Sequence, residues 1–72
     1  MKLDRDIVEA HKQTMIAKVL PILESNYHPA HIDIKWREID KEDHITLSMT
    51  IVDVRTDETI IHQFQNVFPL YG

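Results

Sequence analysis

The sequence predicts an α+β domain in which one N-terminal helix packs on a three-stranded antiparallel β-meander. Three observations predict it. Apolar residues recur at helical spacing in the first third, apolar and polar residues alternate after Ala30, and short polar turns separate the alternating stretches. A chain of 72 residues has room for a single domain, which we expect to span residues 1–72 in the order α-β-β-β.

The apolar spacing in the first third of the chain predicts a helix whose N-cap is Asp4. Leu3 and the first residue of the apolar stripe are expected to form a hydrophobic staple across this cap. Pro21 cannot donate a backbone hydrogen bond, but apolar spacing continues beyond it, so we expect a kinked helix that runs through Glu24. The apolar stripe consists of Val8, Met15, Val19 and Leu23.

Three stretches with a period of two predict the strands. In the first, Ile32, Ile34 and Trp36 are expected to face the core, and polar turns at 40–43 and 55–58 separate the strands. The third strand is expected over residues 59–65. The core-facing residues of the second strand are Ile45, Leu47, Met49 and Ile51.

Small size and missing cysteines predict a homodimer. A chain of this length buries only about 60% of the surface that its unfolded form exposes, and no disulfide can compensate. The sheet face opposite the helix is expected to carry Val52, Val54 and Ile61, so either a bulge or a second buried surface begins at Val52. Two open sheet edges also favour association. The apolar residues of the tail are expected to dock on this chain or another; they are Val67, Phe68, Leu70 and Tyr71.

Charge and composition argue against several classes of function. Twelve acidic residues stand against eight lysines and arginines, and a net charge of −4 without a basic cluster disfavours direct nucleic-acid binding. No apolar run approaches the roughly 20 residues that span a bilayer, and the N-terminal segment does not resemble a signal peptide. We therefore expect a cytoplasmic protein without a membrane partner.

No pattern of a known catalytic site is present. The only glycine is Gly72, so no phosphate-binding loop is possible, and the chain has no cysteine nucleophile. No serine stands in the context of a nucleophile elbow. We expect a protein that is not an enzyme and that needs no cofactor or metal.

Acidic residues provide the leading functional hypothesis. Spaced carboxylates on a small scaffold can present negative charge to a basic protein surface, much as a phosphate backbone does. The six candidate partner-binding residues are Asp40, Glu42, Asp43, Asp53, Asp57 and Glu58. The profile is similar in kind to the small acidic inhibitors with which phages and mobile elements block host proteins. The sharper form of the hypothesis is a competitive inhibitor whose acidic residues mimic nucleic acid and block the basic surface of a nucleic-acid-binding protein.

Two other hypotheses stay open at this point. The stretch HPAHIDIKWR (28–37) places His28, His31 and Asp33 within six positions, and a further ligand from His44 or His62 would make a site for a metal or small ligand. Such histidines are also common as ordinary residues of a connector. Alternatively, the protein is an assembly subunit whose apolar tail makes the partner contact.

Overall fold

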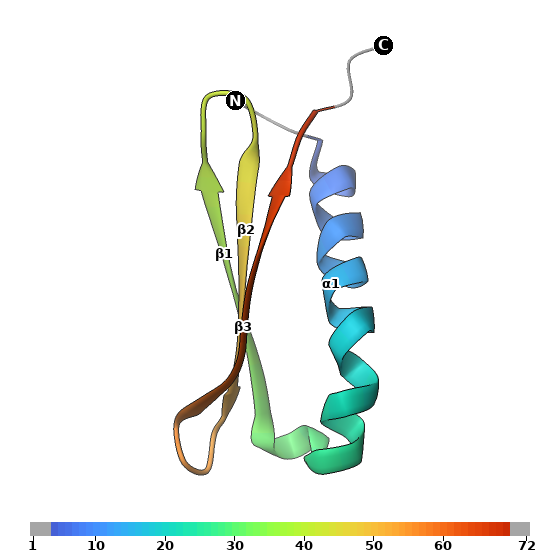
Figure 1. Cartoon of the computed structure of the whole chain (residues 1–72), viewed down its shortest axis with the longest axis vertical. Coiled ribbons are helices and arrows are strands. Elements are labelled where there is room, and N and C mark those ends of the chain that lie inside the picture. Colours follow the sequence, from blue (N-terminus) through green and yellow to red (C-terminus); the bar gives the residue numbers. More distant parts are fainter. Residues whose placement is uncertain (1–3, 70–72) are drawn as a thin grey trace.

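One helix and three strands make up the structure, a computed structural model that describes residues 4–69 (Figure 1). Helix α1 (Arg5–Asn26) leads through a 3₁₀ turn, η1 (Pro29–His31), into the sheet. Strands β1 (Ile32–Asp40), β2 (Ile45–Asp53) and β3 (Glu58–Val67) form an antiparallel sheet in the order β1-β2-β3. Because α1 lies along one face of this sheet, the predicted α-β-β-β architecture is confirmed.

Helix α1 begins and packs as the sequence predicts. Asp4 is the N-cap, and its carboxylate accepts a hydrogen bond of 2.9 Å from the backbone N–H of Asp6. Leu3, the other half of the predicted staple, lies outside the described residues. The buried residues of α1 are those of the predicted stripe: Val8, Met15, Val19 and Leu23.

The helix continues through Pro21 and ends two residues beyond the predicted Glu24. Pro21 has no N–H to donate to the carbonyl of Ala17. Both residues are exposed, so water can satisfy that carbonyl. At the C-terminal end, the backbone N–H of Tyr27 donates to the carbonyl of Leu23 at 2.8 Å and closes the last turn.

The central strand β2 contributes most of the buried apolar residues of the sheet. Its predicted core residues, Ile45, Leu47, Met49 and Ile51, are all at most 6% exposed. Trp36 is paired with Met49, and cross-strand partners point to the same face, so the tryptophan packs against the core as predicted. On the opposite face, called here the open face, the side chains of β2 are Thr46, Ser48, Thr50 and Val52.

The register between β2 and β3 shifts between Ile51 and Val52, where a bulge was one of the two alternatives expected. Ile51 pairs with Ile61 and Val52 with Thr59, which leaves Ile60 without a direct partner. The placement of Ile61 on the open face was wrong. As the partner of Ile51, it faces the helix and packs against the core.

Several element boundaries differ from the prediction. Asp40 is the last residue of β1, where it pairs with Ile45, and Glu58 is the first residue of β3. The alternation that begins after Ala30 would start the first strand at His31, but His31 belongs to η1, because Pro29 has the backbone angle of a helical first position. Its backbone N–H donates to the carbonyl of His28 at 2.9 Å.

The end of β3 anchors the start of the apolar tail. Val67 is completely buried in the core. Phe68 is 55% exposed, and its ring lies 4.9 Å from that of His44. Leu70 and Tyr71 lie outside the described residues.

Candidate functional site

The candidate acidic residues form two groups at opposite ends of the molecule. Asp40, Glu42 and Asp43 lie at the β1–β2 turn, whereas the other three lie around the β2–β3 turn (Figure 1). The molecule is 43 Å long, and the sheet runs along this axis. The structure therefore does not bring all six residues together.

The N-cap and the first turn of α1 add two carboxylates, Asp4 and Asp6, to the end that carries the β1–β2 turn. Because α1 and β1 run in opposite directions, the start of the helix lies at the end where β1 finishes (Figure 1). Arg5 and Lys41 also lie at this end, called here the acidic end after its carboxylates, which are Asp4, Asp6, Asp40, Glu42 and Asp43. All five carboxylates are exposed.

Asp43 makes one local contact at the acidic end. Its carboxylate lies 2.6 Å from Nδ1 of His44, and this contact lowers the pKa of Asp43. The Asp43 side chain is 76% exposed, whereas that of His44 is mostly covered. The carboxylate therefore keeps its negative charge at neutral pH and remains accessible to a partner.

Asp53 has a different environment from the other candidates. It is 7% exposed, and its carboxylate accepts hydrogen bonds from the backbone N–H of Arg55 at 2.9 Å and from its guanidinium at 3.1 Å. These contacts hold the pKa of Asp53 below its usual range. Asp53 therefore stabilises the β2–β3 turn and has little surface to offer a partner.

The other two residues at this turn are exposed. Asp57 has a φ of 60°, in the left-handed region that Asp and Asn tolerate better than most residues. Its backbone N–H donates to the carbonyl of Asp53 at 2.7 Å and completes the turn. Glu58 follows as the exposed first residue of β3.

Two basic residues of α1, Arg5 and Lys12, bind Glu38 of β1, a contact that was not predicted from the sequence. Glu38 lies on the helix-facing side of β1 and accepts hydrogen bonds of 3.0 Å from both Arg5 and Lys12. These two cations lower the pKa of Glu38 to about 2. The ammonium of Lys12 also lies 5.6 Å from the centre of the Trp36 ring.

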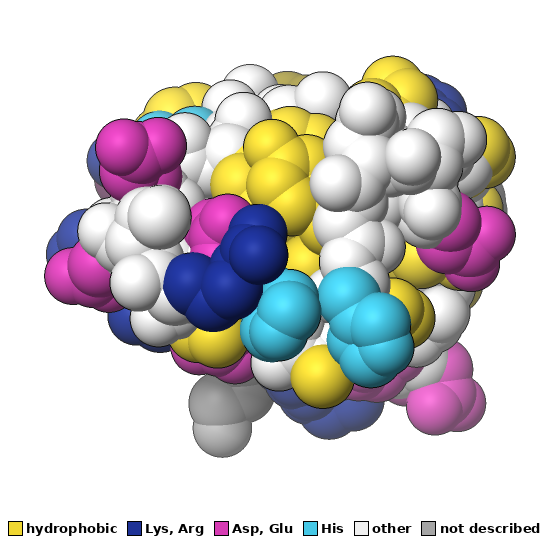
Figure 2. Space-filling view, turned by 90° about the horizontal axis from the view of Figure 1, so that it is seen from below, with side chains coloured by type: hydrophobic (Ala, Val, Ile, Leu, Met, Phe, Trp, Pro, Cys, Tyr) yellow, Lys and Arg dark blue, Asp and Glu magenta, His cyan; other side chains and the backbone are white. Residues whose placement is uncertain are grey.

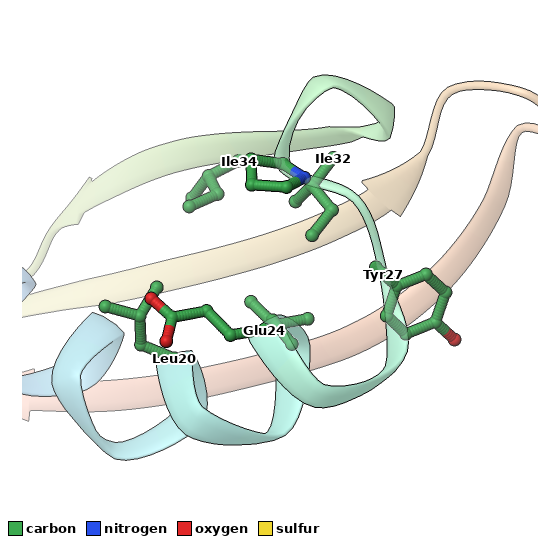
Figure 3. Close-up of a pocket in the computed structure, with 7 residues that line it drawn as sticks. Leu20, Glu24, Tyr27, Ile32 and Ile34 are labelled. Atoms are coloured by element: carbon green, nitrogen blue, oxygen red, sulfur yellow. The ribbon is translucent and has the colours of Figure 1, made fainter.

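An apolar groove separates the C-terminal half of α1 from the start of β1 (Figure 3). It encloses about 210 Å³, and Glu24 and Tyr27 are the titratable residues of its lining. Among residues 4–69, no second carboxylate or histidine lines it, so these residues offer a contact surface without a pair of carboxylates or histidines for acid–base chemistry. The lining consists of Leu20, Leu23, Glu24, Tyr27, Pro29, Ile32 and Ile34.

The two histidines before β1 lie together at the end opposite the acidic end, where Figure 2 shows histidine side chains next to each other. The rings of His28 and His31 are 5.4 Å apart. Nδ1 of His28 accepts a hydrogen bond of 3.1 Å from the backbone N–H of Ala30, so this nitrogen is occupied by the turn. Within residues 4–69, no three histidine, aspartate or glutamate side chains are grouped so that they could hold a metal ion.

The histidines considered as further ligands have other contacts. His44 contacts Asp43 at the acidic end. His62 lies on the open face, where its Nε2 is 3.2 Å from the hydroxyl of Ser48, the side chain of a buried residue. Each has a local structural role.

In comparisons with known proteins, no protein-family model, curated protein or solved structure matches this chain. In the part of the chain that the structure describes, no helix is both long and apolar enough to cross a membrane.

Proposed function

We propose that this chain is a non-enzymatic, homodimeric protein-binding module whose acidic end binds a basic protein surface. One observation carries the proposal. The fold gathers Asp4 and Asp6 with Asp40, Glu42 and Asp43 at one end, although the two groups lie more than thirty positions apart in the sequence. Exposed carboxylates at one end suit a partner with a complementary basic patch.

Three of the chain's cations are paired with its own carboxylates. Arg5 and Lys12 are bound to Glu38 and Glu9, and Arg55 is bound to Asp53. These three cations are thereby held by carboxylates of the chain itself. Such an arrangement suits a competitor for the basic site of a nucleic-acid-binding protein, in which carboxylates take the place of phosphates.

The test compares two variants of equal charge. The first, Asp40→Asn/Glu42→Gln/Asp43→Asn, removes three charges from the acidic end. The second, Asp33→Asn/Asp57→Asn/Glu58→Gln, removes three exposed carboxylates elsewhere, and asparagine at 57 tolerates the left-handed backbone. Both variants and the wild-type chain are immobilised and used to capture proteins from lysate at about 50 and 500 mM salt.

We expect the wild-type chain and the second variant to capture the same nucleic-acid-binding protein, and duplex DNA to displace it. Titration of this protein should show affinity at least about tenfold weaker at the higher salt concentration and for the first variant. Equal capture by both variants, or capture that is unchanged at about 500 mM salt, would contradict a role of the acidic end.

A further inference from the structure

The two edges of the sheet differ in charge. Strand β1 is charged at five of its nine positions, whereas β3 has a charged residue only at its start, Glu58. Charged side chains on an edge strand are a common protection against pairing with another chain. Residues 59–67 of β3 lack this protection. The charged residues of β1 are Asp33, Lys35, Arg37, Glu38 and Asp40.

Exposed apolar side chains lie on both sides of the β3 edge. On the open face, Phe64 is 62% exposed, and its ring lies 4.6 Å from that of His62. On the helix side, Ile22 is 59% exposed. Ile22 follows His11 by eleven positions, about three helical turns, so both lie on the same side of α1. His11 contacts Gln65 of β3 at 2.7 Å, which shows that this side of the helix faces β3.

We propose that β3 pairs with the β3 strand of a second copy of this chain, antiparallel and edge to edge. The result is a six-stranded sheet with both helices on the same face. This inference rests on the homodimer of the proposed function and assigns its interface. We assign the pairing strand to a second copy because two identical antiparallel strands are self-complementary about a two-fold axis. Residues 59–67 contain no acidic residue, lysine or arginine, so the pairing places no like charges of these residues opposite each other.

The uncharged segment 59–67 has Gln63 at its midpoint, which defines the expected register. With Gln63 on the two-fold axis, His62 of one copy lies opposite Phe64 of the other. The His62–Phe64 ring contact on the open face is then extended across the interface. Gln63 is exposed on the helix-facing side, where it lies opposite its own copy.

A single introduced cysteine tests this register, because the natural chain has none. Under mild oxidation, we expect Gln63→Cys to form a covalent dimer with twice the 8.5 kDa mass of the chain on a non-reducing gel. The matched control is Gln13→Cys, at an exposed position of α1, which should cross-link far less. Equal yields from the two variants, or no dimer from Gln63→Cys, would overturn the register.

A matched pair of charge variants tests the edge itself. Gln63→Lys places two lysines against each other at the interface, whereas Gln13→Lys makes the same substitution on α1. In sedimentation equilibrium, we expect Gln63→Lys to raise the dimer dissociation constant at least about fivefold and Gln13→Lys to leave it unchanged. Circular dichroism checks that both variants fold.

The possible results separate the interface from the dimer. If Gln63→Lys and Gln13→Lys both dimerise as tightly as the wild-type chain, the assignment of the interface to β3 fails but the homodimer stands. If the wild-type chain is monomeric up to about 1 mM, both the homodimer and its interface fail. Binding of a basic partner through the acidic end is measured separately and survives either result.

Discussion

Glu38 shows how one side chain can connect two elements. It receives Arg5 and Lys12 of α1 on the helix-facing side of β1, and Lys12 in turn covers Trp36. The side chain of Glu38 is 30% exposed, so solvent screens part of the attraction. The contribution of this ion-pair cluster to stability is therefore modest, and it depends on the ionised form of Glu38.

Replacing Glu38 by glutamine should lower the free energy of unfolding by about 1 kcal/mol at pH 7. The pKa of Glu38 is about 2 in the folded chain, below its ordinary value of 4.5. The stabilisation is thus fully present above pH 4.5 and is lost as the pH falls toward 2. Urea unfolding at pH 7, 4 and 2.5 should show a difference between wild type and Glu38→Gln that shrinks with falling pH.

The control for this experiment is Glu42→Gln, the same substitution at an exposed position of the β1–β2 turn. We expect it to change the free energy of unfolding by less than about 0.5 kcal/mol at pH 7. A Glu38→Gln difference that stayed constant down to pH 2.5 would show that packing, and not the charge of Glu38, explains its effect.

At the scale of elements, α1 contains a residue that ordinarily ends helices. The apolar stripe extends to Leu23, beyond Pro21, and burial of this last residue keeps the final turn against the sheet. The missing hydrogen bond to Ala17 lies on the exposed side of α1. Tertiary packing therefore outweighs the local preference of proline.

Substituting Pro21 by alanine should raise the free energy of unfolding by about 1–3 kcal/mol, because the helix regains a hydrogen bond to Ala17 and loses a steric conflict. Urea unfolding of Pro21→Ala checks this. Lys18→Ala, an exposed substitution in the preceding turn, controls for helix propensity and should have an effect below about 0.5 kcal/mol. A loss of stability in Pro21→Ala would mean that the rigid ring benefits the fold.

At the scale of the whole molecule, the long shape separates two surfaces with different chemistry. The acidic end lies at one end of the 43 Å long axis of the molecule. The edge of β3 runs along the sheet and has no acidic residue, lysine or arginine over residues 59–67. In the proposed dimer, β3 pairs along its length, and two acidic ends point outward in opposite directions. One dimer would then bind two basic surfaces, one at each acidic end.

Such a dimer makes thermal stability depend on concentration. The core of a single short chain is small, and association adds burial only in the folded state. We expect the melting temperature to rise by several degrees when the protein concentration increases about a hundredfold, and to rise less for Gln63→Lys. Differential scanning calorimetry at several concentrations measures this. A constant melting temperature would argue that folding and association are independent.

Local periodicity determined most of the fold. Helical spacing identified the buried residues of α1, and alternation identified those of β2, because both periods follow from backbone geometry within one element. The change of apolar face at Val52 left a bulge and a second buried surface as alternatives, and only the strand pairing places the extra residue in β3, at Ile60. Ile61 was predicted on the wrong face of the sheet. Its face follows from its cross-strand partner, Ile51, and this pairing is known only from the structure.

Only the tertiary structure decided which charges meet. Glu38 lies 33 positions from Arg5 and 26 from Lys12, and nothing in the sequence near any of them shows the contact. Likewise, the start of α1 and the β1–β2 turn share one end because successive elements reverse direction. Short-range periods in the sequence determined the buried side of α1 and the helix-facing side of β2. Which carboxylates are exposed together depended on chain direction and register, and these arise only when the elements pack.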